Sequence, residues 1–240
     1  MFRIAIKALC AASIALPSAF SAVGCAGPTH TSDVRFDVAT LESTASADDL
    51  PRTAIFAERT ATFQITRGQH AGDRLTLSVT RDGSTGTITR TLGDGTKLSE
   101  QRFEITNDGT VIERAFQNHE RDVIVELEPD LRLWPVKGRT QKLDFRLPKL
   151  SDPDSIKERG TATNTATIES LDTVTTPAGT FEAIRVRIVF ESDLTAADAK
   201  RITERWYTRD HGLIAERWDE TVKAFGIPIE QSSRTIVRTP

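Results

Sequence analysis

The chain has 240 residues, with 31 Lys and Arg against 34 Asp and Glu, so the formal net charge is −3. Hydrophobic residues make up 38% and charged residues 27%, as in ordinary globular proteins, and the length suits one or two domains with a sizeable core. The near balance of charge excludes the basic face of a typical nucleic-acid-binding protein. Beyond the extreme N-terminus, no apolar run is long enough to cross a bilayer.

Residues 1–24 have the parts of a secretory signal. Residues 1–7 carry Arg3 and Lys7 and no acid, and residues 8–16 form a short apolar stretch. Small residues then lead to Cys25. A basic start, an apolar middle and a small-residue site predict export followed by removal of the leader.

The tetrapeptide Ala22-Val23-Gly24-Cys25 resembles the lipobox of bacterial lipoproteins, with Ala22 in place of the usual Leu. The resemblance implies cleavage before Cys25 and attachment of acyl chains such as palmitate, which together anchor the protein stably to a membrane. Because Ala26 rather than Asp follows the cysteine, it also implies sorting to the periplasmic side of the outer membrane. The alternative is ordinary cleavage after Gly24 or Ser21.

The remaining chain divides into a tether, residues 25–33, and a β domain, residues 34–240. The tether is small and polar. The sequence has two cysteines, Cys10 and Cys25, so the domain contains no disulfide. Its stability must therefore come from its core and its sheet ladders.

Apolar and polar residues alternate along much of the domain. This pattern predicts strands with one buried and one wet face, and the 32 threonines favour the same conformation. Val34, Phe36 and Val38 alternate before a loop over residues 43–49. The clearest later apolar runs are Leu75, Leu77 and Val79; Val123, Val125 and Leu127; and Ile184, Val186, Ile188 and Phe190.

Turn signals recur at hairpin spacing. The pairs Asp82-Gly83, Asp94-Gly95 and Asp108-Gly109 each separate two candidate strands, which predicts a meander over about residues 73–127. Further corners are expected at residues 177–179 and 210–212.

The fold class that follows is all-β: a single domain of roughly ten strands, forming a strongly curved antiparallel sheet or partly open barrel with at most one or two short helices. Ser151–Glu158 predicts one helical turn, and the Ala-rich Leu194–Arg201 a short helix. The alternative is a two-sheet sandwich, for which Ser151–Gly160 is the expected hinge between lobes.

Three segments resemble a group of secreted, β-rich bacterial proteins of unknown function: Leu133–Gly138, the PAGTF-containing Thr175–Ala183, and the WY…GL hairpin Glu204–Ile214. The Trp usual after the first Gly is missing, because Arg139 follows Gly138. The resemblance implies a curved antiparallel sheet similar to the LolA-like and LolB-like lipoprotein carriers, and it supplies no catalytic residue. Fold similarity alone does not establish function.

No catalytic constellation, cofactor motif or metal site is expected. The four histidines have no metal-ligand spacing, and no nucleophile elbow or phosphate loop occurs. His119, in a polar segment that could suggest acid–base chemistry, is interpreted as part of a turn. Asp152 and Asp154 are interpreted as a solvated turn rather than calcium ligands. We therefore expect a protein that is not an enzyme.

Two functional hypotheses follow. The first is a membrane-anchored binding module that holds an apolar ligand or lipid in a concavity. The second is a structural or interaction lipoprotein with a packed core and a surface site for an envelope protein. Trp206 and Tyr207, adjacent in a strand, must point to opposite faces. The candidate ligand-lining residues are Phe145, Phe181, Phe190, Trp206 and Trp218.

Overall fold

The computed structural model describes residues 34–41, 45, 49–195 and 197–240. The expected leader, tether and acylation site Cys25 lie outside the described residues, as does most of the expected loop at 43–49. No helix in the described part of the chain is long and apolar enough to span a bilayer.

Twelve antiparallel strands form a closed ring in the order β10-β11-β12-β13-β14-β2-β3-β4-β5-β6-β7-β9. Pairing of β9 with β10 closes the ring, for example at Leu143 opposite Ala162. The all-β, single-domain prediction is confirmed, but the barrel is closed rather than partly open and has more strands than roughly ten.

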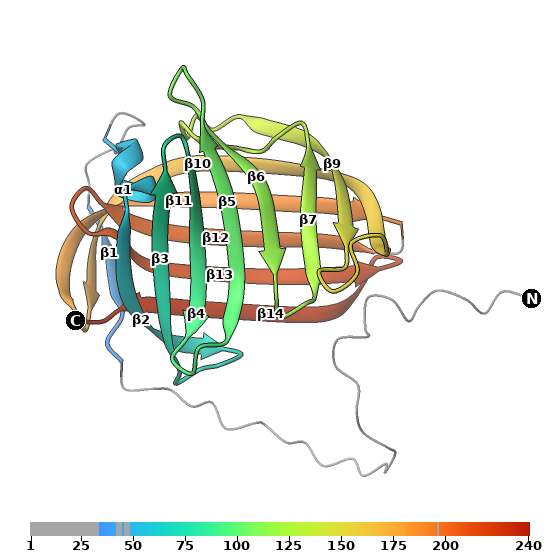
Figure 1. The fold of residues 1–240 in the computed structure, drawn as a ribbon. Helices are drawn as coiled ribbons and strands as arrows, with labels where there is room; N and C mark the ends of the chain where they lie inside the picture. The colour runs from blue at the N-terminus through green and yellow to red at the C-terminus, as the bar shows by residue number, and fades with distance from the viewer. Residues whose placement is uncertain (1–33, 42–44, 46–48, 196) are drawn as a thin grey trace, which may run out of the picture.

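The barrel is flattened, so two layers of strands cross one another (Figure 1). One layer contains β2 (Arg59–Gly68), β3 (Arg74–Asp82), β4 (Thr85–Leu92), β5 (Lys97–Ile105), β6 (Val111–Asn118), β7 (Val123–Glu128) and β9 (Thr140–Pro148). The other contains β10 (Ile156–Thr176), β11 (Gly179–Leu194), β12 (Asp198–Thr208), β13 (Gly212–Ala224) and β14 (Ile227–Arg238).

Three short elements lie outside this ring. Strand β1 (Asp37–Thr40) pairs with the second half of β10, and β8 (Arg132–Trp134) pairs with β6. The one helix among the described residues, α1 (Arg52–Phe56), lies at one end of the barrel (Figure 1). A helix of five residues is too short to show a helical period in the sequence, which is why none was expected at this position.

The predicted Asp-Gly corners are confirmed. They join β3 to β4, β4 to β5 and β5 to β6, and Gly83, Gly95 and Gly109 all have positive φ. In two of the turns the aspartate accepts a hydrogen bond from the backbone two residues on, as Asp94 Oδ1 does from Thr96 N at 2.8 Å. The corners at 177–179 and 210–212 join β10 to β11 and β12 to β13.

Both expected helical segments are wrong, because hairpin pairing overrides their local helix signals. In Ser151–Glu158, Ser155 N donates to Asp152 O in a tight turn, and β10 begins at Ile156. In Leu194–Arg201, pairing continues to Asp193 opposite Asp198, which leaves a turn too short for a helix. Ser151–Gly160 is likewise no hinge, since it joins β9 to β10 within one barrel.

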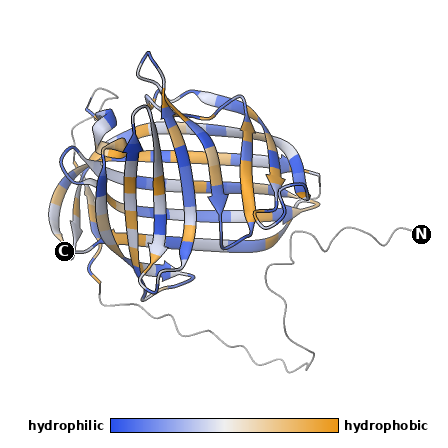
Figure 2. Cartoon of the chain, in the orientation of Figure 1, coloured by the Kyte–Doolittle hydropathy of each residue, from blue (hydrophilic) through white to orange (hydrophobic). Residues whose placement is uncertain are grey.

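Hydrophobic and hydrophilic residues alternate along the strands (Figure 2). The inward residues near α1 form the largest buried cluster, in which Phe56 of the helix packs on Phe103 of β5 with ring centroids 5.0 Å apart. Leu50 and Ala54 are buried in the same cluster. Helix α1 therefore plugs one end of the barrel.

A second buried cluster lies on the opposite, outer face of β10–β14. Trp206 is at its centre, and Val34 and Phe36 of the N-terminal segment pack against it. Trp206 Nε1 donates to the fully buried Asp172 at 2.8 Å. Tyr207 belongs to the inner cluster, so the prediction that these neighbours face opposite ways is confirmed.

Phe56→Ala should lower the free energy of unfolding by about 3 kcal/mol, because it removes a buried ring that the surrounding barrel cannot replace. Urea unfolding followed by tryptophan fluorescence measures the loss. Val38→Ala, at an exposed site on β1, is the matched control and should change stability by less than about 0.5 kcal/mol. Equal stabilities for the two variants would contradict the plug.

Candidate functional site: the barrel lumen

A cavity of about 1570 Å³ occupies the barrel interior. Eight strands make a barrel that side chains can fill, whereas twelve leave a wider interior. The cavity extends from the α1 plug towards the other end of the barrel, where its lining includes Lys149, Lys157 and Glu230 near strand-connecting turns. The lumen is therefore the site that the architecture itself creates.

One part of the lumen wall is apolar. Its side chains, all half-buried except the buried Phe145, face the cavity from β6, β7, β9 and β11, and Phe145 packs on Phe190 with ring centroids 6.0 Å apart. Apolar side chains that are not covered by other side chains are the usual lining of ligand pockets. The main members of this apolar wall are Phe116, Val125, Leu127, Phe145, Leu147, Ile188 and Phe190.

The rest of the wall is charged, and its centre is Glu216 of β13, which is only 4% exposed. Glu216 Oε2 accepts a hydrogen bond from Arg205 Nε of the adjacent strand at 2.6 Å and from Arg90 Nη2 of β4 at 2.9 Å. Three strands, β14, β2 and β3, separate β13 from β4 around the ring. The Arg90 bond therefore crosses the lumen.

Two further carboxylates pair across the lumen in the same way. Arg121, in the turn after β6, donates to Glu220 of β13 at 2.8 Å. Arg234 of β14 donates to Glu120 in that same turn at 2.7 Å, and His70 lies 3.2 Å from the same Glu120 oxygen. These contacts tie the two layers together through their interior.

Trp218 of β13 lies between two arginines in the lumen. The guanidinium carbon of Arg201 lies 4.3 Å from the ring centroid and that of Arg234 lies 5.8 Å away, which are cation–π distances. Arg201 is 4.0 Å from the nearest Glu220 oxygen and has no hydrogen bond to any residue that the structure describes. Its donors are therefore free for a ligand.

The lumen shifts the pKa of several groups. Burial would raise the pKa of Glu216, but Arg90 and Arg205 outweigh it and hold the pKa at about 2. Burial lowers the pKa of Arg201 to about 10. Burial also raises the pKa of Glu113 to about 7, although the Gln101 amide donates to its carboxylate. Near neutral pH, Glu113 is therefore a titrating group inside the barrel.

The five aromatic candidates from the sequence divide between the two faces. Phe145, Phe190 and Trp218 line the lumen together. Trp206 and Phe181 belong instead to the outer cluster, where Phe181 also packs edge-on against His211. Their rings have no place in the cavity lining.

The charges inside the barrel are not among the residues expected from the sequence. Arg205 and Arg217 lie in the paired strands β12 and β13, as the expected hairpin implies, but the hairpin motif does not indicate a hydrated inner face. A signal is present in residues 198–205, where both faces of a central strand are largely polar. Arg201, Thr203 and Arg205 form one face of it. A strand that is polar on both faces indicates that the supposed core side is hydrated or ligand-lined.

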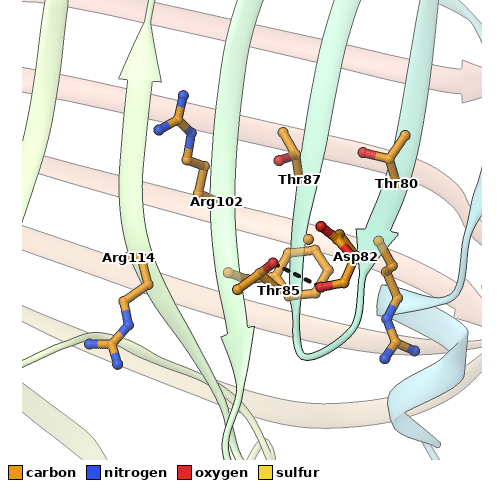
Figure 3. A pocket seen from close by; sticks show the side chains of 9 residues that line it. Thr80, Asp82, Thr85, Thr87, Arg102 and Arg114 are labelled. Carbon is orange, nitrogen blue, oxygen red and sulfur yellow. Dashed lines mark hydrogen bonds between the residues drawn. The ribbon is translucent and has the colours of Figure 1, made fainter.

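A second, smaller hollow of about 300 Å³ lies at β3–β6 (Figure 3). Thr80, Thr87, Arg102 and Arg114 border it, and Thr85 Oγ1 donates to Asp82 O beside it. Both arginines have carboxylate partners in Glu100 and Glu104 respectively. Because this hollow is smaller and its arginines are already paired, it is a weaker candidate for a ligand site than the lumen.

No group of three or more His, Cys, Asp or Glu side chains that could hold a metal ion occurs among the described residues. His119 lies in the turn between β6 and β7, as the sequence predicted, and its Nε2 is buried with no hydrogen-bond partner in the described structure. Its neighbour Glu120 pairs with His70 and Arg234.

These features define a class of protein: a closed twelve-stranded antiparallel barrel with a large lumen that is partly apolar and partly charged. No family model matches the chain, and no curated protein matches it.

Two solved structures resemble the chain in backbone. One is a Bacteroides fragilis protein described as exported and as having a YmcC-like fold, with 14% identity and a TM-score of 0.43 over 77% of this chain and 97% of that one. The other is a Parabacteroides distasonis protein described as a lipoprotein, with 12% identity and a TM-score of 0.43 over 75% and 94% of the two chains. At these identities the likeness transfers no residue role.

Glu216→Gln should lower the free energy of unfolding at pH 7 by about 3 kcal/mol, because two half-buried arginines lose their shared, buried carboxylate. The pKa of Glu216 in the folded state lies below its ordinary value of 4.5. Its stabilisation is therefore complete above pH 4.5 and is lost as the pH falls towards 2.

Urea unfolding between pH 7 and pH 2 measures this difference, and the gap between wild type and Glu216→Gln should close at the acid end. Glu191→Gln removes an exposed pair with Lys200 and should cost less than about 1 kcal/mol at any pH. A constant gap across the range would contradict the assignment of the low pKa.

Glu113→Gln should remove a loss of stability that the wild type suffers as the pH rises, which is the opposite of the acid-side loss at Glu216. Because the folded pKa of Glu113 is raised from 4.5 to about 7, its contribution is complete below pH 4.5 and is lost as the pH rises through 7. Wild type should lose about 3 kcal/mol relative to Glu113→Gln between pH 4.5 and pH 8. Parallel stability profiles from chemical unfolding would disprove the buried titration.

Proposed function

We propose that this protein is a non-enzymatic binding module that holds an apolar or lipid-like ligand in the barrel lumen. The observation that carries the proposal is the 1570 Å³ cavity with its apolar wall of half-buried side chains. Cavities for drug-sized ligands measure about 300–1,000 Å³, so this volume suits something larger, such as one or more acyl chains. A wall of phenylalanine and leucine is a poor partner for water but a good one for alkyl chains.

The module is proposed to be tethered to the bacterial envelope through Cys25, on the periplasmic side of the outer membrane. The support is the leader, the lipobox-like tetrapeptide and Ala26 after the cysteine. No nucleic acid or cofactor is part of the proposal. A lipid or an envelope protein is the partner that this location provides.

The alternative is an interaction lipoprotein that acts through its surface. One observation favours it: the β13–β14 hairpin exposes Phe225 by 86%, Ile227 by 66% and Ile229 by 47%. A cluster of exposed large apolar side chains is typical of a contact site. This alternative assumes a fully packed core, whereas the barrel interior contains a large cavity. The binding module is therefore the better supported of the two.

Binding in the lumen is tested with N-phenyl-1-naphthylamine, an apolar dye that becomes fluorescent in dry surroundings. Ile188→Trp should weaken dye binding by about tenfold or more, because the indole fills part of the apolar wall. Val189→Trp places the same indole on the outer face of the same strand and should bind like wild type.

Native mass spectrometry of detergent-free protein supplies the second measurement, and a co-purifying lipid is expected. Equal dye binding by the two tryptophan variants, with no lipid retained, would reject the binding module.

Anchoring is tested by metabolic labelling with palmitate. The wild-type chain should incorporate label and sediment with the membrane fraction, whereas Cys25→Ala should do neither, because it lacks the thiol that is acylated. An unlabelled wild-type chain would end the lipoprotein assignment and leave the lumen proposal standing.

A further inference from the structure

We infer that the ligand is a long-chain amphiphile with a single carboxylate or phosphate group, and that Arg201 binds this anionic head. The inference rests on the proposed function of the lumen and adds the chemical class of the ligand. It starts from the difference between Arg201 and the other arginines of the cavity.

Four other arginines that line the lumen each have a carboxylate within hydrogen-bond distance. Arg90 and Arg205 share Glu216, Arg121 donates to Glu220, and Arg234 donates to Glu120. Arg201 differs from these four: its nearest carboxylate oxygen is 4.0 Å away, on Glu220. That glutamate already accepts a hydrogen bond from Arg121.

Stacking leaves the guanidinium of Arg201 ready for an anion. Its carbon lies 4.3 Å from the Trp218 ring centroid, so the indole supports one face of the group. The N–H groups of a stacked guanidinium project from its edge, where they fit a carboxylate or phosphate with two parallel hydrogen bonds. A ligand with a positive head would meet the wrong charge here.

Two unpartnered donors lie in the same wall on β14, two strands away from Arg201. The Ser232 hydroxyl and the Arg234 Nε are both buried without a hydrogen-bond partner in the described structure. Ser232 is paired in register with Glu220, and Arg234 with Trp218. Buried polar groups are normally satisfied, so these two unsatisfied groups in the wall that also holds Arg201 indicate a missing acceptor.

The apolar wall begins one strand away from this anion site. Phe190 is the register partner of Arg201, and its ring packs on Phe145. Leu127 is in turn the partner of Phe145 on β7. An alkyl chain attached to a head at Arg201 therefore has a continuous apolar path to follow.

The charge of the lining agrees with an anionic guest. Nine basic and seven acidic side chains line the cavity, whereas the whole chain has a net charge of −3. The lining therefore carries more positive than negative charge, and the low dielectric of the interior strengthens its attraction for an anion.

The test compares four probes with the same twelve-carbon chain: dodecanoate, dodecyl phosphate, dodecan-1-ol and dodecyltrimethylammonium, each below its micelle-forming concentration. Isothermal titration calorimetry on the wild-type protein should show the two anions binding at least about tenfold more tightly than the alcohol, with the cation weakest. The ratio of the dissociation constants of dodecanoate and dodecyl phosphate shows which of the two head groups the site prefers.

Arg201→Gln should abolish the preference for the anions while leaving the affinity for dodecan-1-ol unchanged, which also shows that the variant folds. Arg217→Gln is the matched control, because Arg217 lies on the outer face of β13 and pairs with Glu204. It should keep the full preference.

The outcomes separate the two proposals. If dodecan-1-ol binds as tightly as dodecanoate to the wild type, or if the preference survives in Arg201→Gln, the anion site is wrong and the apolar lumen remains. If none of the four probes binds, the proposed function itself fails.

Discussion

The carboxylate of Glu216 is shared by two arginines, one on the neighbouring strand and one on the opposite wall of the barrel. A closed ring of twelve strands is too wide for its side chains to meet in a single packed core. Here apolar packing is concentrated near α1, while farther along the barrel the two layers are joined by ion pairs that cross the lumen. Burial makes these carboxylates costly to ionise, and the facing arginines offset that cost. The space between the pairs and the apolar wall is what remains for a ligand.

Much of the fold could be predicted from the sequence because its determinants are local. The Asp-Gly pairs set hairpin corners, and the alternation of Leu75, Leu77 and Val79 set an inward face. Closure of the ring could not be predicted in this way, because it depends on pairing between β9 and β10 after a turn that resembles a helix start. The Ala-rich segment Leu194–Arg201, which runs into β12, predicted a helix wrongly for the same reason. Strand pairing on both sides outweighs a weak helix propensity.

The candidate site was harder to predict than the fold. Alternation shows that Trp206 and Tyr207 face opposite ways, but it does not say which face is the lumen. The outer face of β12 also carries a buried cluster, because the N-terminal segment with Val34 and Phe36 covers it, so a large aromatic residue is expected on either side. The charges of Arg201 and Glu216 look like ordinary surface pairs until the ring closes around them.

Closure also governs how other molecules can approach the barrel. A strand within the ring has its backbone N–H and C=O groups committed to neighbours on both sides, so an extended peptide cannot join the sheet there. Within the described chain, the short strands β1 and β8 lie outside the ring, with four and three residues. Recognition along the ring must therefore use side chains, and the fold resists the edge-to-edge association that open sheets invite.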